Sequence, residues 1–250
     1  MTFIQNYFPK INLNNLSKIP FRSTPMPENP FVTENYYNDS FVSNPLQENI
    51  SDAQRIESLV KSNPRIMELL NKYNIPLKVN MEELSKLQKG HLAHTRLVAA
   101  QLYSGLPDNL KKEVDLSNLQ EAAMLHDYGK IFIPQEILNK KGALTPEEKE
   151  IMELHSELGY EILKSLGVNS EVLRLVKYHH QKSDGSGYPK AEKDFDYDLS
   201  LKILSTADKY TALTEKDRPY RNALSKEDAI QILATEEEND SDIVNALEKI

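Results

Sequence analysis

The six histidines of this chain all fall between residues 91 and 180, and each lies on or beside an apolar stripe with helical spacing. The first stripe repeats at steps of three and four residues, the spacing of one buried helix face, and comprises Leu84, Leu87, His91, His94, Val98 and Leu102. A single histidine on such a face is usually an ordinary core residue. Several buried together need a partner for every ring nitrogen, and metal ions supply such partners. The pattern therefore favours a helical core whose histidines meet around metal.

The composition limits the chemistry of such a centre. The chain contains no cysteine, so a metal ion would have to be bound by imidazole, carboxylate and water. The formal net charge of -8 and the pI near 5.4 argue against binding to duplex nucleic acid, which requires a concentrated basic surface. No signal sequence begins the chain, and no stretch approaches the ~20 apolar residues of a membrane span. We therefore expect a soluble, cytoplasmic protein that does not associate with a membrane.

Residues 1–50 differ from the rest of the chain. They carry six of the 13 prolines and no glycine, a composition that disfavours regular helix. We expect them to form an irregular or disordered N-terminal arm, and residues 51–250 to form one helical domain. No alternating run requires a strand, so the predicted fold class is all-α. The periodicity predicts a loop-rich crossing at QKSDGSGYPKAEKDFDYD and helices at about residues 117–127, 146–166, 169–180, 199–214, 225–235 and 240–249.

The helix that begins at residue 146 has a complete N-terminal signature. Thr145 is its expected N-cap, Pro146 occupies the first helical position, and Glu148 closes a capping box. Its apolar face includes His155. The prediction therefore places this histidine in the core.

The sharpest local motif is HDYGK, which directly follows the apolar run AAML. Neighbouring residues on a helix point about 100° apart, so His126 and Asp127 can serve one centre only if the helix ends there, which Gly129 permits. The two oxygens of Asp127 would then bridge two ions while His126 binds one of them. Lys130 would place a positive charge beside a phosphate oxygen. The alternative is a helix C-terminus with a capping glycine and a solvated lysine.

Asp208 is a second candidate ligand. It lies in LKILSTADKYTAL, where it shares one helix face with Leu201, Leu204 and Thr211. An unpaired buried carboxylate is costly, so a cation partner is the economical explanation for its position. A salt bridge to an arginine is the alternative.

HDYGK, His155, HHQKSDGSGYP, Asp208 and RPYR together resemble, in this order and spacing, the HD superfamily of metal-dependent phosphohydrolases. The GYP element points to its HD-GYP branch, and the resemblance covers roughly residues 90 to 225. It implies an HD-domain helical bundle with a loop-rich GYP segment. It also implies hydrolysis of cyclic-di-GMP, through a metal-bridged hydroxide, to the linear dinucleotide or to GMP.

The resemblance also implies a set of site residues and two divalent ions, iron or manganese. One ion would be held by His94, His126, Asp127 and Asp208. The second would be held by Asp127, His155, His179 and His180. The catalytic residues would be Asp127 and Lys130, and the substrate would be contacted by Lys130, Tyr188, Arg218 and Arg221. A signalling protein is an expected partner of the GYP loop.

Several positions depart from the family pattern. His94 is chosen because HTRLVA resembles the opening HSxRVA, although His91 on the same stripe is a substitute. Gly90 stands where three-ion members carry a glutamate, so two ions are expected and a third is less favoured. Two departures bear on rate and substrate preference, Gln181 for glutamate and Thr211 for an acid. Leu97 replaces the arginine of the HSxRVA pattern, and one extra residue before RPYR bears on the placement of Arg218 and Arg221.

Two other functions remain open at this point. The chain would be a nucleotidase or another phosphomonoesterase of the wider superfamily, or a non-catalytic module that binds a cyclic dinucleotide or a partner protein in signalling. The substitutions named above motivate the second of these. Retention of the buried histidines and aspartates argues against it, because a site freed from catalysis has little reason to keep them.

Overall fold

The computed structural model describes residues 52–193, 195–216, 222–236 and 241–250. Over these residues the chain is helical and contains no β-strand, as the sequence predicts. The predicted arm at residues 1–50 lies outside the described residues. The helices, with η1 a 3₁₀ helix, are α2 (Asp52–Ser62), α3 (Pro64–Lys72), α4 (Met81–Lys89), α5 (His91–Gly105), α6 (Asp108–Lys111), α7 (Leu116–Leu125), η1 (Tyr128–Phe132), α8 (Gln135–Leu138), α9 (Pro146–Ser165), α10 (Ser170–Tyr178), α11 (Leu199–Thr214), α12 (Lys226–Ala234) and α13 (Ser241–Glu248).

Several helices begin where the sequence supplies a capping side chain. The predicted capping box is present at α9, where the Thr145 hydroxyl accepts from the Glu148 N–H and the Glu148 carboxylate accepts from the Thr145 N–H. Side-chain oxygens of Asn169, Asp198 and Ser225 cap α10, α11 and α12 by accepting from backbone N–H groups of the first turn. These helix boundaries agree closely with the predicted ones, because adjacent residues decide them.

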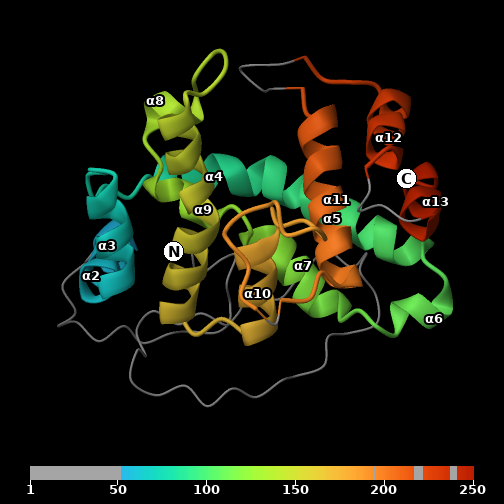
Figure 1. The fold of residues 1–250 in the computed structure, drawn as a ribbon, viewed down its shortest axis with the longest axis horizontal. Helices are drawn as coiled ribbons and strands as arrows, with labels where there is room; N and C mark the ends of the chain where they lie inside the picture. The colour runs from blue at the N-terminus through green and yellow to red at the C-terminus, as the bar shows by residue number, and fades with distance from the viewer. Residues whose placement is uncertain (1–51, 194, 217–221, 237–240) are drawn as a thin grey trace, which may run out of the picture.

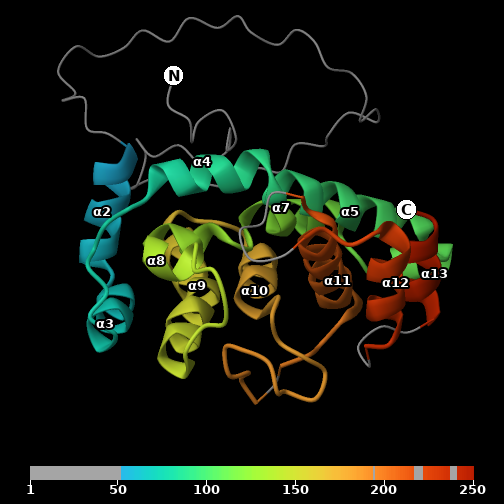
Figure 2. The ribbon, with the colours of Figure 1, turned by 90° about the horizontal axis from the view of Figure 1, so that it is seen from above.

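Two consecutive helices, α4 and α5, run one after the other across the molecule (Figure 1), and α7, α11 and α13 pack against α5. Figure 2 shows α9, α10 and α11 side by side on one side of α4 and α5. In the same view, α2 and α3 lie at one end of the molecule and α12 and α13 at the other. The main contacts join α5 to α11 and α7, and α9 to α10 and η1. The helices that carry the predicted site residues therefore converge on a shared interior.

The single stripe predicted from residue 84 to residue 102 is divided in the structure. Gly90, with φ −104° and ψ −102°, lies outside the helical region and separates α4 from α5. The buried positions of α5 are His91, Leu92, Thr95, Val98, Ala99 and Leu102. Of the positions that the stripe predicts in this helix, His91, Val98 and Leu102 are therefore buried, and His94 is exposed.

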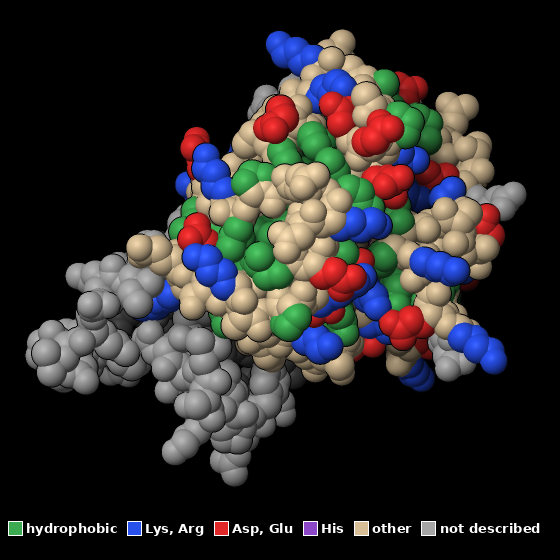
Figure 3. All heavy atoms as spheres, turned by 60° about the vertical axis from the view of Figure 1, so that its left-hand side comes forward, with side chains coloured by type: hydrophobic (Ala, Val, Ile, Leu, Met, Phe, Trp, Pro, Cys, Tyr) green, Lys and Arg blue, Asp and Glu red, His purple; other side chains and the backbone are tan. Residues whose placement is uncertain are grey.

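The surface shows mixed charge where it can be seen. On the face drawn in Figure 3, lysine and arginine side chains are interspersed with aspartate and glutamate and do not form one basic patch. That face lacks the concentrated positive charge that duplex nucleic acid requires. In the part of the chain that the structure describes, no helix combines the length and the apolar character needed to cross a bilayer.

Candidate metal centre

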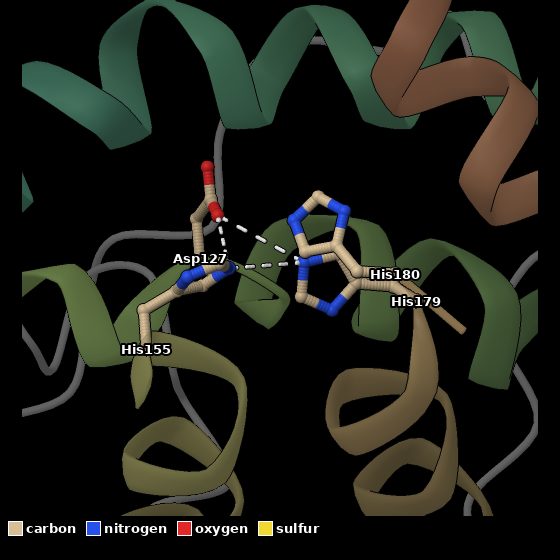
Figure 4. Close-up of side chains that lie close together, drawn as sticks. All are labelled: Asp127, His155, His179 and His180. Carbon is tan, nitrogen blue, oxygen red and sulfur yellow. Dashed lines mark hydrogen bonds and ion pairs between the residues drawn. The ribbon is translucent and has the colours of Figure 1, made fainter. Parts of the chain in front are cut away.

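Two groups of histidine and aspartate side chains meet in the interior, and within each group the potential ligand atoms lie within 4.8 Å of one another. The first group consists of Asp127, His155, His179 and His180. Figure 4 shows these four side chains converging from three separate segments of the chain. The second group consists of His91, His126 and Asp208.

Helix ends supply several of these side chains. The last residue of α7 is Leu125, so His126 is its C-cap and Asp127 precedes the 3₁₀ helix η1. His179 is likewise the C-cap of α10. The helix therefore ends at the HD pair, as the sequence predicts, and the two adjacent side chains are free to point into one centre. His155 and Asp208 instead project from within α9 and α11.

Asp127 lies between the two groups, with one carboxylate oxygen toward each. Its Oδ1 lies 3.4 Å from Nε2 of His155 and 4.0 Å from Nε2 of His179. Its Oδ2 lies 3.6 Å from Nε2 of His126 and 3.7 Å from Nε2 of His91. A carboxylate divided in this way is suited to bridge two cations, one in each group.

In three of the histidines, the contact made by Nδ1 decides which ring nitrogen carries the proton. Nδ1 of His126, His155 and His179 lies 2.9, 2.7 and 2.7 Å from the backbone oxygen of the residue three positions earlier. Because a carbonyl oxygen only accepts, each Nδ1 carries the proton, and Nε2 of the neutral ring presents a lone pair. Nε2 of His155 and Nε2 of His179 lie 3.3 Å apart. Two lone pairs held this close repel, and a shared cation removes the repulsion.

Burial favours the neutral form of His155, His179 and His180, and it leaves some polar atoms of the centre without partners. It lowers the pKa of His155 to about 3 and that of His180 to about 4, and it lowers the pKa of His179 well below its ordinary value. Nε2 of His126 and Oδ1 of Asp127 are buried and make no hydrogen bond. A buried polar atom without a partner costs ~1–3 kcal/mol, so such atoms are rare. The residues present therefore fit divalent cations bound by imidazole nitrogen and carboxylate oxygen.

His91 and Asp208 form the closest pair of the second group. Nε2 of His91 lies 2.8 Å from Oδ1 of Asp208, and Nε2 of His126 lies 3.6 Å from the same oxygen. Burial acts to lower the pKa of His91, but hydrogen bonds with Asp208 and Glu215 outweigh burial and raise this pKa to about 9. Among the described residues, the ion-pair partners of Asp208 are histidines and not an arginine. The arrangement agrees with a carboxylate that belongs to a cation site.

His94, which the resemblance places at the metal centre, lies outside both groups. Its side chain is exposed, whereas His91 is 5% exposed and contacts Asp208. The buried face of α5 is centred near Thr95. At 100° per residue, His94 points about 100° away from the middle of that face. The ligand assignment is therefore corrected from His94 to His91.

A cavity of about 510 Å³ opens beside the two groups. Its wall includes His91, His155 and His180 of the centre together with Lys130 and Tyr188, two predicted substrate contacts. The ring centroids of Tyr188 and His180 lie 4.7 Å apart. A molecule in this cavity would contact both groups and the charge of Lys130. The rest of the wall is formed by Glu83, Lys86, Leu87, Gly90, Ile137, Leu138, Asn139, Lys140, Gly142, Leu144, Met152 and Glu215.

Gly129 has a different role from the one predicted. It is not among the glycines with positive φ, so it does not cap α7 in a left-handed conformation. Instead, a Cβ on Gly129 would overlap the carbonyl oxygen of His155 and lie 2.6 Å from the backbone nitrogen of Gly159. The glycine permits η1 to touch the backbone of α9. This contact sets the separation between Asp127 and His155.

The side chain of Gln181 links parts of the GYP segment through three hydrogen bonds. Its Nε2 donates to the carbonyl of Pro189 at 2.8 Å, and its Oε1 accepts from the N–H groups of Lys182 and Gly187 at 2.9 and 2.8 Å. An ionised glutamate has no donor for the Pro189 carbonyl. The amide at this position therefore supplies a hydrogen bond that a carboxylate would lose.

The remaining predicted residues divide into two cases. Arg218 and Arg221 lie outside the described residues. Thr211 is buried in α11, and its hydroxyl oxygen makes no hydrogen bond.

Glu215 was not predicted, yet its Oε2 lies 3.4 Å from Nδ1 of His91. Its spacing of seven residues from Asp208, which is close to two helical turns, was the available signal.

The HD domain family matches residues 77–243, a segment that contains every member of the two groups. The chain belongs to the HD domain family. Its HDYGK and HHQKSDGSGYP motifs place this HD domain in the HD-GYP branch.

This HD domain is similar to parts of several curated proteins. A cyclic di-GMP phosphodiesterase of Thermotoga maritima is 43% identical over 123 residues, which make up 48% of this chain and 33% of that protein. The 3'3'-cGAMP-specific phosphodiesterase 2 of Vibrio cholerae is 36% identical over 179 residues, which make up 62% of this chain and 32% of that protein. The matches thus span about a third of the length of these relatives.

A solved structure also matches the HD domain. It is Bd1817, a HDG"Y"P protein from Bdellovibrio bacteriovorus, with 18% sequence identity and a TM-score of 0.47 over 78% of this chain and 67% of that chain.

Proposed function

We propose that this HD domain is a metal-dependent phosphodiesterase that hydrolyses a cyclic dinucleotide, cyclic-di-GMP, to the linear dinucleotide or to GMP. The observation that carries the proposal is the position of Asp127, whose two oxygens face two separate groups of potential ligands. The names of the similar proteins, which include cyclic di-GMP and 3'3'-cGAMP phosphodiesterases, support the substrate class.

The two groups would supply the ligands of two divalent ions, iron or manganese. When bound, the ions would lower the pKa of a water molecule and neutralise charge on the phosphoryl group. One ion would be held by Asp127, His155, His179 and His180. The other would be held by His91, His126, Asp127 and Asp208.

The residues on the cavity wall would bind and orient the substrate. Lys130 is 21% exposed, and its ammonium would contact an oxygen of the scissile phosphate. Tyr188 presents an aromatic ring beside His180, where a nucleobase would stack. Most of the ligand histidines are buried, so charges in the centre would interact with a bound phosphate more strongly than in solution.

The test is an assay of the full chain, purified without oxygen and loaded with Fe²⁺ or Mn²⁺. Cyclic-di-GMP, 3'3'-cGAMP and nucleoside monophosphates are supplied separately, and products are resolved by chromatography. We expect turnover of a cyclic dinucleotide and loss of turnover after chelation. Turnover of monophosphates alone would assign a nucleotidase or another phosphomonoesterase. Binding of a cyclic dinucleotide by metal-loaded protein without turnover would assign a non-catalytic signalling module.

A further inference from the structure

His91 differs from the other ligand histidines in the contact that its Nδ1 makes. In three of those histidines, Nδ1 donates to a backbone carbonyl three residues earlier. In His91, Nδ1 instead lies 3.4 Å from Oε2 of Glu215. Its ring is therefore held between two carboxylates, with Asp208 at Nε2 and Glu215 at Nδ1.

Glu215 reaches His91 from the end of α11. It is the C-cap residue of that helix, and its N–H donates to the Thr211 carbonyl at 3.0 Å. It follows Asp208 by about two helical turns, so both carboxylates lie on the face of α11 that packs on α5. One helix therefore supplies both carboxylates that hold the ring.

Glu215 also packs beside Gly90. A Cβ placed on Gly90 would lie 3.5 Å from Oε1 of Glu215, which is ordinary van der Waals distance. The carboxylate thus packs over the glycine with one oxygen and faces His91 with the other. The side chain of Glu215 is only 24% exposed, so packing limits the positions that it can adopt.

We propose that Glu215 is a positioning residue of the metal centre: its carboxylate accepts the Nδ1 proton of His91 and keeps Nε2 directed at the ion. This inference rests on the proposed metal-dependent function and adds a residue to it. A carboxylate behind a ligand histidine fixes the tautomer and makes Nε2 a stronger electron donor. Loss of such a partner costs ~10 to 100-fold in metal affinity or activity.

The test is calorimetric titration of the metal-free full chain with Zn²⁺, which is diamagnetic and permits NMR of the same samples. Glu215→Ala removes the acceptor, and Glu215→Asp keeps the charge but shortens the reach. Both should weaken one of the two binding events ~10 to 100-fold. Glu215→Gln keeps an oxygen that accepts from Nδ1, so it should retain most of the affinity. Nitrogen-15 spectra should show His91 protonated at Nδ1 in the wild type and in Glu215→Gln.

Glu83→Gln is the matched control, because it removes a buried carboxylate from the wall of the same cavity. It should leave both affinities at the wild-type values. Wild-type affinity in Glu215→Ala would overturn the positioning role while leaving the proposed function intact. A loss in Glu215→Gln as large as that in Glu215→Ala would also overturn it, because charge alone would then explain the effect. A wild-type chain that binds no ion would overturn the positioning role and the proposed function together.

Discussion

Nζ of Lys130 lies 2.5 Å from Oδ2 of Asp127, the carboxylate oxygen that also faces His91 and His126. Burial acts to raise the pKa of Asp127, but the charge of Lys130 and the neighbouring imidazoles hold it well below its usual range. In the metal-free chain, the ammonium thus neutralises the carboxylate that would bridge the ions. The lysine is positioned both to stabilise Asp127 and to meet a phosphate in the cavity.

Replacement of Lys130 by methionine separates these two roles. If Lys130 contacts the scissile phosphate, Lys130→Met should lower kcat by ~100 to 1000-fold, the usual cost of removing one group that stabilises transition-state charge. The ion content, measured by elemental analysis, should remain that of the wild type because no ligand is removed. Unchanged kcat with full ion content would remove Lys130 from the catalytic residues.

The choice of His91 over His94 as a metal ligand predicts that substitution of these two histidines has different effects on ion affinity. His91→Ala should lower the affinity for one ion, because His91 faces Asp208 and Asp127. His94→Ala should leave both affinities unchanged, because His94 is exposed on the same helix. Titration of both metal-free variants compares them directly. Ion loss in His94→Ala together with full binding in His91→Ala would restore the ligand implied by the resemblance.

Gly129 predicts a large effect of a small substitution. Gly129→Ala would drive a methyl group into the backbone of α9, so it should destabilise the fold by ~3 kcal/mol and disturb the separation of Asp127 and His155. Gly167→Ala is the control: no atom lies within 4 Å of its added Cβ, and its positive φ of 79° costs ~1 kcal/mol. Urea unfolding followed by circular dichroism measures both changes. Equal stability of the two variants would contradict the close approach of η1 and α9.

The raised pKa of His91 predicts how the stability of the metal-free protein depends on pH. Its pKa is about 9 in the folded chain against an ordinary value of 6.5. The charged ring therefore stabilises the fold fully below pH 6.5, and this contribution is lost as pH rises toward 9. The Tm of the metal-free wild type should fall across this window, and the fall should be smaller in His91→Gln. A wild-type Tm that falls no more than that of His91→Gln would contradict the pairing of His91 with Asp208.

The features that the sequence predicts well are those decided by neighbouring residues or by a motif. The capping box of Thr145 and Glu148 sets the start of α9, and the HD pair follows directly at the end of α7. The bridging role predicted for Asp127 requires only a carboxylate placed directly after the end of a helix. Its geometry in the structure has one oxygen toward each group.

The features that the sequence does not reveal depend on backbone geometry and on contacts between distant helices. The backbone angles at Gly90 end α4, and in the helix that follows His94 is exposed although the stripe predicted it to be buried. The contact between His91 and Glu215 joins residues far apart in the chain and exists because α5 packs on α11. Periodicity in one segment carries no information about either.

The most direct test of a two-ion centre bridged by Asp127 is the ion content of single-ligand variants, measured by elemental analysis after purification without oxygen. We predict two ions per chain in the wild type, a loss of both in Asp127→Ala, and a loss of only one in His126→Ala or in His155→Ala. Two ions retained in Asp127→Ala, or none bound by the wild type, would contradict the account.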